Sequence, residues 1–239
     1  MDKYNDFMEY MREKGLSENS ISSYVNDIKI FIDFFKNKYG EDINSINHIL
    51  VSEYIKELKN LGRKPLTINR KIAAIKNYND FFVDIGIQKE NVIKAKDYIK
   101  IYPQLMAPYS PSEKDVLKLK LEAKDNKRNL AIIVTLSNTG MRVSELINLR
   151  ITDLHFESRI IMVKGKGNKV RIVIMSDAVY DAIKAYLDER KQNNTYELNN
   201  YVFIGRQNIK KDIALHRSTI NTILKKYSIK FEKKYILIC

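Results

Sequence analysis

Apolar and polar residues alternate along the first 85 residues with the three- and four-residue spacing of amphipathic helices. The longest apolar stripe stops before Gly40, which suits the left-handed turn that closes a helix. Pro65 stands where a first helical turn tolerates proline. The pattern predicts helices over residues 3–13, 17–39, 49–61 and 65–83.

The pattern weakens after residue 85. Residues 86–109 contain Pro103 and Pro108 and lack a sustained period, although residues 91–100 have the spacing of one more short helix. We therefore predict a linker over residues 86–109 and, over residues 1–85, a first domain that is a bundle of four or five helices.

From residue 110 onwards the sequence mixes helical and strand periods. Ser110-Pro111-Ser112-Glu113 predicts a capped helix start, and the apolar run at residues 130–136 predicts a helix that ends at Gly140. Two β-branched runs flank Gly165-Lys166-Gly167-Asn168, which is typical of a hairpin with Lys166 at its tip. The remaining elements expected are strands at 150–153, 159–164 and 169–175, a helix capped by Ser176 or Asp177, and a helix at 218–228. Residues 110–239 should thus form an α+β domain with a small three-stranded antiparallel sheet, in a chain that is mainly α overall.

Charge is distributed unevenly between the two predicted domains. The formal net charge of +13 divides into +2 for residues 1–109 and +11 for residues 110–239. A polyanion is therefore the expected partner, and double-stranded DNA is favoured over an anionic membrane surface because no basic amphipathic helix has a wide apolar face. The first domain still has one basic stretch, residues 59–79, which contains six cationic residues and no acid. A solvated helix face is the alternative reading of that stretch.

Cysteine usage and the termini bear on compartment and cofactors. A single cysteine, Cys239, excludes an intramolecular disulfide and offers no metal cluster, which fits a reducing cytoplasm. The charged N-terminus lacks the apolar core of a signal peptide, and no run approaches transmembrane length. We expect a soluble, cytoplasmic protein with no metal and no cofactor.

The most informative stretch is residues 139–150, TGMRVSELINLR. Gly140 should turn the chain sharply between two helices, so that Arg142 is presented from a rigid corner. A planar guanidinium held there suits bidentate capture of a phosphate, and Glu145 lies one helical turn further on, where it can orient that guanidinium. The alternative is an ordinary structural Arg-Glu pair at i,i+3 spacing.

Together with VKGKGNKVRIVIM at residues 163–175, this stretch resembles the tyrosine recombinases, the family of phage integrases and Xer-type resolvases. The resemblance extends upstream through residues 67–75 and downstream through residues 218–227, and therefore covers most of the chain but not its end. It implies a SAM-like core-binding domain followed by a catalytic domain. It also implies site-specific DNA recombination or integration without a metal or cofactor.

The resemblance assigns roles to individual residues. Arg142 matches the first catalytic arginine, Glu145 its supporting acid and Lys166 the hairpin lysine that acts as general acid. Residues expected to contact DNA are Thr67, Asn69, Arg70, Lys71 and Lys76 in the first domain and Lys169 in the hairpin.

Other parts of the family pattern are missing. A His-x-x-Arg box and a nucleophilic tyrosine should follow the helix that ends near Tyr227, but residues 229–239 contain neither His nor Arg. Tyr227 and Tyr235 are poor nucleophile candidates because both precede the expected position. We therefore expect no nucleophile in this chain, a catalytic domain incomplete at its C-terminus, and a truncated recombinase that is unable to cleave DNA.

Two other hypotheses remain open. The chain could be a non-catalytic DNA-binding accessory or antagonist protein derived from a recombinase, or an unfolded pseudogene product. The resemblance implies that family members exchange a C-terminal helix when they assemble on DNA, and we expect this chain to lack that helix. The expected state in solution is therefore a monomer, with other recombinase copies as possible partners on DNA.

Overall fold

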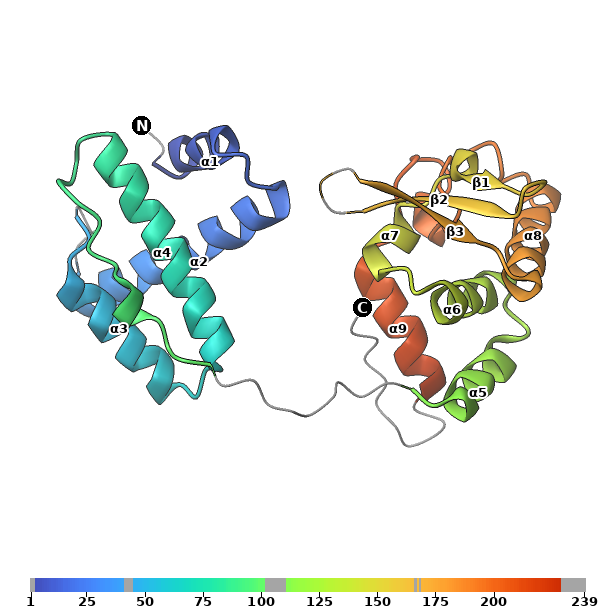
Figure 1. The fold of residues 1–239 in the computed structure, drawn as a ribbon, viewed down its shortest axis with the longest axis horizontal. Coiled ribbons are helices and arrows are strands. Elements are labelled where there is room, and N and C mark those ends of the chain that lie inside the picture. The colour runs from blue at the N-terminus through green and yellow to red at the C-terminus, as the bar shows by residue number, and fades with distance from the viewer. Residues whose placement is uncertain (1–2, 41–44, 102–110, 166, 168, 229–239) are drawn as a thin grey trace. The chain divides into compact units, whose positions relative to one another are not determined.

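The computed structural model describes residues 3–40, 45–101, 111–165, 167 and 169–228. The chain divides into two compact units, Met1–Met106 and Ala107–Cys239, which we call the first and second unit (Figure 1). None of the helices in the described ranges combines the length and apolar character needed to cross a membrane.

The first unit is a helical bundle, as its hydrophobic spacing predicts. The Ser17 side chain caps one long helix at its start, and Gly40 closes that helix in the left-handed conformation at φ 75°. Aromatic rings fill the core, where Phe7 meets Tyr78 edge-on and Phe31 meets Tyr54 in the same way. The helices are α1 (Lys3–Glu13), α2 (Glu18–Tyr39), α3 (His48–Asn60) and α4 (Pro65–Asp84).

The predicted linker is wrong over its first part. Ile93 is buried in the core of the first unit, and the backbone N–H of Val92 donates to the Asn79 side chain at 2.9 Å. The short helix expected at 91–100 is only a 3₁₀ turn, Ala95–Asp97. Residues 87–101 therefore belong to the first unit, because they cover apolar surface that the helices alone leave open. The rest of the predicted linker, residues 102–110, lies outside the described residues.

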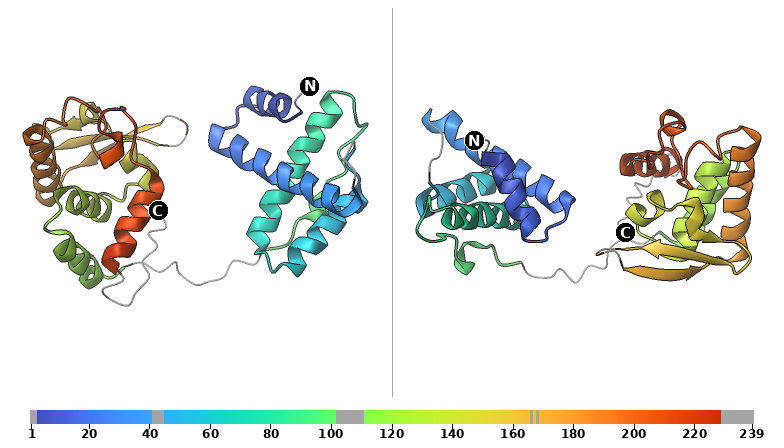
Figure 2. Two further views of the ribbon diagram at one scale, coloured as in Figure 1. Left: turned by 180° about the vertical axis from the view of Figure 1, so that it is seen from behind. Right: turned by 90° about the horizontal axis from the view of Figure 1, so that it is seen from above.

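The second unit combines helices with a small sheet in the order β1-β2-β3, antiparallel throughout. Ile161 and Val163 point from β2 into the core, whereas Ile172 and Ile174 of β3 face solvent. Helices α6 and α8 pack against each other, and Figure 2 shows both on the same side of the sheet. The elements are α5 (Glu113–Ala123), α6 (Lys127–Thr139), α7 (Val143–Ile147), β1 (Leu154–His155), β2 (Ile160–Lys164), β3 (Val170–Ile174), α8 (Asp177–Gln192) and α9 (Arg217–Ser228).

Two predicted element starts are wrong by a few residues, and side-chain capping explains both. Ser112 caps α5, and the partner in its capping box is Asp115, so the helix begins after Pro111 rather than at it. The strand expected at 150–153 is instead a 3₁₀ helix, Ile151–Asp153, because the Asp153 carboxylate accepts the Arg150 backbone N–H at 2.9 Å. The short strand β1 begins only at Leu154.

A buried arginine fastens the end of α8 to the segment that follows it. Arg190 is 2% exposed, and its two terminal nitrogens donate to backbone carbonyls of Thr195, Tyr196, Asn199, Tyr201 and Val202. Burial lowers the pKa of Arg190, which has no carboxylate partner among the described residues. This single side chain therefore satisfies acceptors that would otherwise be buried without donors.

We expect Arg190→Met to destabilise the second unit by about 3 kcal/mol or more, because it keeps the aliphatic stem but leaves several buried carbonyls unpaired. Lys191→Met, at an exposed neighbouring position, is the matched control and should change stability little. Urea unfolding followed by circular dichroism measures the loss, and hydrogen exchange assigns it to a unit. Faster exchange in the first unit, or equal effects of both variants, would contradict this role.

Candidate nucleic-acid interface

Arg142 stands at the corner that the sequence predicts. Helix α6 ends at Gly140, whose φ of 62° is the left-handed value that glycine adopts readily, and Met141 anchors the turn in the core. Arg142 is the N-cap residue of α7, and its backbone N–H donates to Glu145 Oε2 at 2.8 Å. Its guanidinium Nη1 donates to Glu145 Oε1 at 3.0 Å. Because the Arg142 side chain is 63% exposed and that of Glu145 only 3%, the cation faces solvent with the acid behind it.

A second arginine, Arg171 of β3, binds the same carboxylate. Its Nη1 and Nη2 donate to Glu145 Oε1 and Oε2, both at 2.7 Å, in the bidentate geometry of a strong ion pair. Sequence reasoning gave Arg171 no role, although a signal was available. Arg171 pairs with Val163, which is buried, so Arg171 lies on the inner face of the hairpin although its side chain is 41% exposed; an arginine at such a position suggests an ion pair.

Glu145 is strongly acidic as a result. Chiefly the Arg171 hydrogen bonds lower its pKa to about 2, against the opposing effect of burial. The ionised carboxylate thus holds two guanidinium groups, and the cluster of Arg142, Glu145 and Arg171 has a surplus positive charge. We call these three residues the arginine clamp.

The hairpin approaches the clamp closely. A Cβ on Gly165 would lie 3.4 Å from Glu145 Oε1 and 3.7 Å from Arg171 Nη1, which is van der Waals contact with the clamp. The backbone N–H of Gly165 donates to the Lys169 carbonyl at 2.8 Å and closes the turn, in which Gly167 is left-handed at φ 73°. Lys169 is exposed. Lys166, the predicted general acid, lies outside the described residues, and its role stays a prediction.

In the first unit, two of the predicted DNA contacts are engaged internally. The Asn69 amide exchanges two hydrogen bonds of 2.8 Å with the backbone of Ile99, which fixes the segment after α4. The Lys71 side chain is 9% exposed, and its Nζ lies 2.9 Å from a carboxylate oxygen of Asp27. Both side chains are thus engaged inside the unit, and the contact of Asn69 and Lys71 with DNA stays a prediction.

The other three predicted contacts remain accessible to different degrees. Arg70 is exposed and pairs with Asp27, and Lys76 is exposed and pairs with Asp80 at 2.9 Å along α4. Thr67 is partly exposed in the first turn of α4. Arg70 therefore combines an exposed side chain with a position fixed by its ion pair to Asp27.

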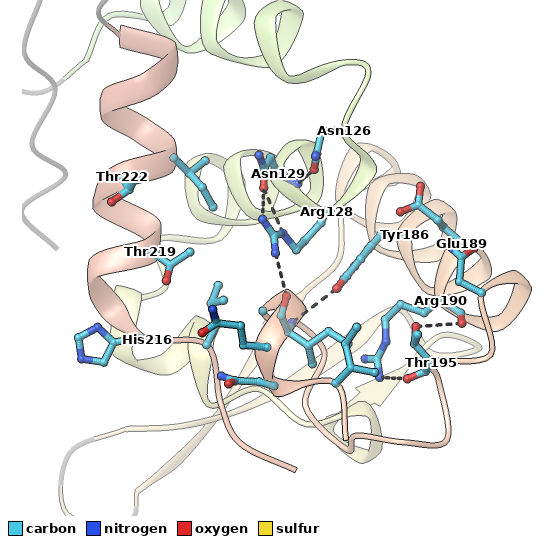
Figure 3. Close-up of a pocket in the computed structure, with 18 of the residues that line it drawn as sticks. Asn126, Arg128, Asn129, Tyr186, Glu189, Arg190, Thr195, His216, Thr219 and Thr222 are labelled. Atoms are coloured by element: carbon cyan, nitrogen blue, oxygen red, sulfur yellow. Dashed lines mark hydrogen bonds between the residues drawn. The ribbon is translucent and has the colours of Figure 1, made fainter. Parts of the chain in front are cut away.

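A cleft of about 910 Å³ lies between α6, α8 and α9 of the second unit, away from the arginine clamp (Figure 3). Arg128 lies in it and donates to the Ile204 carbonyl at 3.0 Å and to the Asn129 side chain. The Tyr227 hydroxyl accepts from Asn129 at 3.0 Å, and the tyrosine is buried at 6% exposure. The environment of Tyr227 is therefore that of a core residue and not of a nucleophile. In the part of the chain that the structure describes, no group of three or more metal-binding side chains comes together.

Comparison with known proteins identifies the family. The phage integrase family matches residues 112–236, and the phage integrase N-terminal SAM-like domain matches residues 4–86. The chain belongs to the phage integrase family, the tyrosine recombinases. Because the first match runs to residue 236, the expectation that the resemblance stops near Tyr227 is wrong.

Two relatives illustrate the similarity in sequence. The chain is 33% identical over 232 residues to a TnP I resolvase from Bacillus thuringiensis, covering 95% of this chain and 80% of the relative. It is 30% identical over 191 residues to the tyrosine recombinase XerD of Oceanobacillus iheyensis, covering 79% of this chain and 64% of that protein. The chain therefore spans less than two thirds of the length of that XerD.

Solved structures share the fold at low sequence identity. A Tn1549 transposon integrase in complex with transposon right end DNA matches at a TM-score of 0.68 and 19% identity, covering all of this chain and 82% of that one. A lambda integrase dimer bound to a COC′ core site matches at 0.68 and 13% identity, covering 98% and 81%. The fold is therefore that of integrase structures, with a helical unit and an α+β unit.

The low pKa of Glu145 makes stability depend on pH. A carboxylate whose pKa falls from 4.5 to about 2 on folding contributes stability above its unfolded pKa and loses it as the pH falls toward 2. We expect Glu145→Gln to destabilise the protein by about 3 kcal/mol at pH 7, and the difference from wild type to narrow below pH 4. Urea unfolding of the variant and the wild type at pH 7 and below pH 4 measures this difference in stability. Glu157→Gln, at an exposed carboxylate of the same unit, is the control; an unchanging deficit for Glu145→Gln would contradict the pKa argument.

Proposed function

We propose that the chain binds duplex DNA at a recombination site and belongs to a site-specific recombinase or integrase system. The observation that carries this proposal is the arginine clamp, in which Arg142 is 63% exposed while the carboxylate behind it is 3% exposed. The Arg142 guanidinium is already held in place by its hydrogen bonds to Glu145. It therefore loses little conformational entropy when it binds an anion. A backbone phosphate is the anion that fits the family and the net charge of +13.

In the proposed chemistry, Arg142 holds a non-bridging oxygen of the phosphate that is to be cleaved. Such a contact stabilises the negative charge that develops when a phosphodiester is attacked. Glu145 and Arg171 keep the Arg142 guanidinium in place and need not touch the phosphate. Lys166 at the hairpin turn is proposed as the proton donor to the departing 5′ oxygen. The nucleophile is assigned to no described residue.

Double-stranded DNA and other recombinase copies are the proposed partners. One lambda integrase structure is a dimer bound to a core site and another is a tetramer bound to a Holliday junction, which supports this proposal by analogy. A monomer away from DNA and a cytoplasmic location remain predictions.

A second candidate function is a DNA-binding accessory protein that occupies the site without cutting it. It differs from the first in requiring the clamp for binding only. The exposed guanidinium of Arg142 is sufficient for this function, because phosphate binding needs no reacting group beside it. A covalent complex between the purified chain and a nicked suicide duplex, detected on a denaturing gel, distinguishes the two functions.

Binding should depend on salt through Arg142. Titration of a mixed-sequence duplex, followed by fluorescence anisotropy at several salt concentrations, measures the counterions released. We expect Arg142→Ala to weaken binding and to lower the log-log salt slope by roughly 0.9, the value for one phosphate contact on duplex DNA.

Arg159→Ala is the matched control. Arg159 is 43% exposed and also pairs with an acid, but it lies at the end of β2 remote from the hairpin turn. The Arg159→Ala variant removes the same charge as Arg142→Ala and should leave the log-log salt slope unchanged. Equal effects of the two variants would mean that general charge, rather than the clamp, determines binding.

A further inference from the structure

The first unit contains a second nearly buried carboxylate that holds two cations. Asp27 lies in α2 with its side chain 1% exposed. From α4, Arg70 pairs with both of its oxygens, with Nη2 3.1 Å from Oδ1, and Lys71 donates to Oδ1 at 2.9 Å. The cluster repeats the arrangement of Glu145 in the second unit, where one acid also holds two bases.

The two cations of this cluster differ in exposure. Lys71 is 9% exposed and Arg70 is 45% exposed at the side chain. Because a buried acid must be neutralised, Lys71 balances the charge of Asp27 within the unit. The surplus positive charge of the cluster therefore belongs to Arg70 and faces solvent.

Arg70 retains unused hydrogen-bond donors. Asp27 accepts one N–H from each of its terminal nitrogens, and no other acceptor for Arg70 is present in the described part of the chain. A guanidinium has five N–H groups, so Nε–H and the outward N–H groups remain for a ligand. Arg63 and Lys64, both exposed, precede it on the turn before α4 and add charge of the same sign.

We infer that Asp27 is a positioning residue that holds Arg70 for a DNA phosphate, with Lys71 as its fixed counter-charge. This inference rests on the proposed function, because it requires that the first unit binds DNA. The ion pair to Asp27 removes most of the rotamer freedom of Arg70 before DNA arrives. Less entropy is then lost when the phosphate is bound.

The inference and simple electrostatics predict opposite effects for Asp27→Asn. Removal of a negative charge should strengthen DNA binding if only net charge matters. If Asp27 positions Arg70, the variant should instead bind the mixed-sequence duplex about tenfold more weakly, the typical effect of losing one charge-assisted hydrogen bond. The salt slope should fall by roughly 0.9 for the lost phosphate contact.

A double-mutant cycle isolates the coupling. In an Arg70→Ala background, Asp27→Asn should cause no further loss of affinity, because the group it positions is absent. Asp33→Asn, which removes an exposed acid from the same helix as Asp27, is the matched control and should leave binding unchanged or slightly stronger. A tighter complex with Asp27→Asn, or additive losses in the cycle, would overturn the inference.

Folding is controlled separately because Asp27→Asn leaves Lys71 buried without a partner. The double variant Asp27→Asn/Lys71→Met removes both buried charges and should keep the thermal unfolding midpoint close to that of the wild type, while it still binds DNA weakly. Wild-type affinity in this folded variant would refute the positioning role.

If Arg70→Ala leaves affinity unchanged while Arg142→Ala weakens it, this inference fails and the proposed function stands. If the wild-type chain does not bind duplex DNA, the proposed function itself fails.

Discussion

The carboxylate of Glu145 determines the geometry of the candidate site. It accepts hydrogen bonds from the Arg142 backbone, the Arg142 guanidinium and both terminal nitrogens of Arg171. It thereby connects α7 to strand β3, through Glu145 and Arg171, which are 26 positions apart in the sequence. Without an ionised acid at this point, two like charges would lie close together with nothing between them.

In both units a buried carboxylate holds an exposed arginine in place. Glu145 and Asp27 are almost inaccessible, yet each lies behind an arginine that is exposed. An arginine alone on a surface samples many rotamers, whereas one anchored to a buried acid has a defined direction. The two units of the chain thus present cations by the same physical arrangement, although one is built from helices alone and the other from a helix and a sheet.

Local sequence signals predicted most of the elements and missed contacts that depend on tertiary structure. Helix periods, Gly40 and Pro65 gave α2 and α4 nearly to the residue, and Gly140 gave the end of α6, because spacing and capping act over a few positions. The resemblance to the recombinases placed Lys71 among the residues expected to contact DNA, and the sequence gives no sign that Asp27, 44 residues earlier, lies opposite it. Arg171 was overlooked for a similar reason, as its partner lies on another element. Residues 87–101 look like a linker in sequence because their packing depends on surfaces of α3 and α4.

Gly165 has a consequence for how substitutions in the hairpin should be interpreted. A Cβ at this position would meet Glu145 Oε1 at 3.4 Å, the Lys169 carbonyl at 3.5 Å and Arg171 Nη1 at 3.7 Å, all within ordinary van der Waals range. Alanine therefore fits, whereas a longer side chain would have to share this space with the ion pair. A loss of function confined to the larger substitutions would report displacement of Glu145 or Arg171, and it would not be a sign that residue 165 takes part in chemistry.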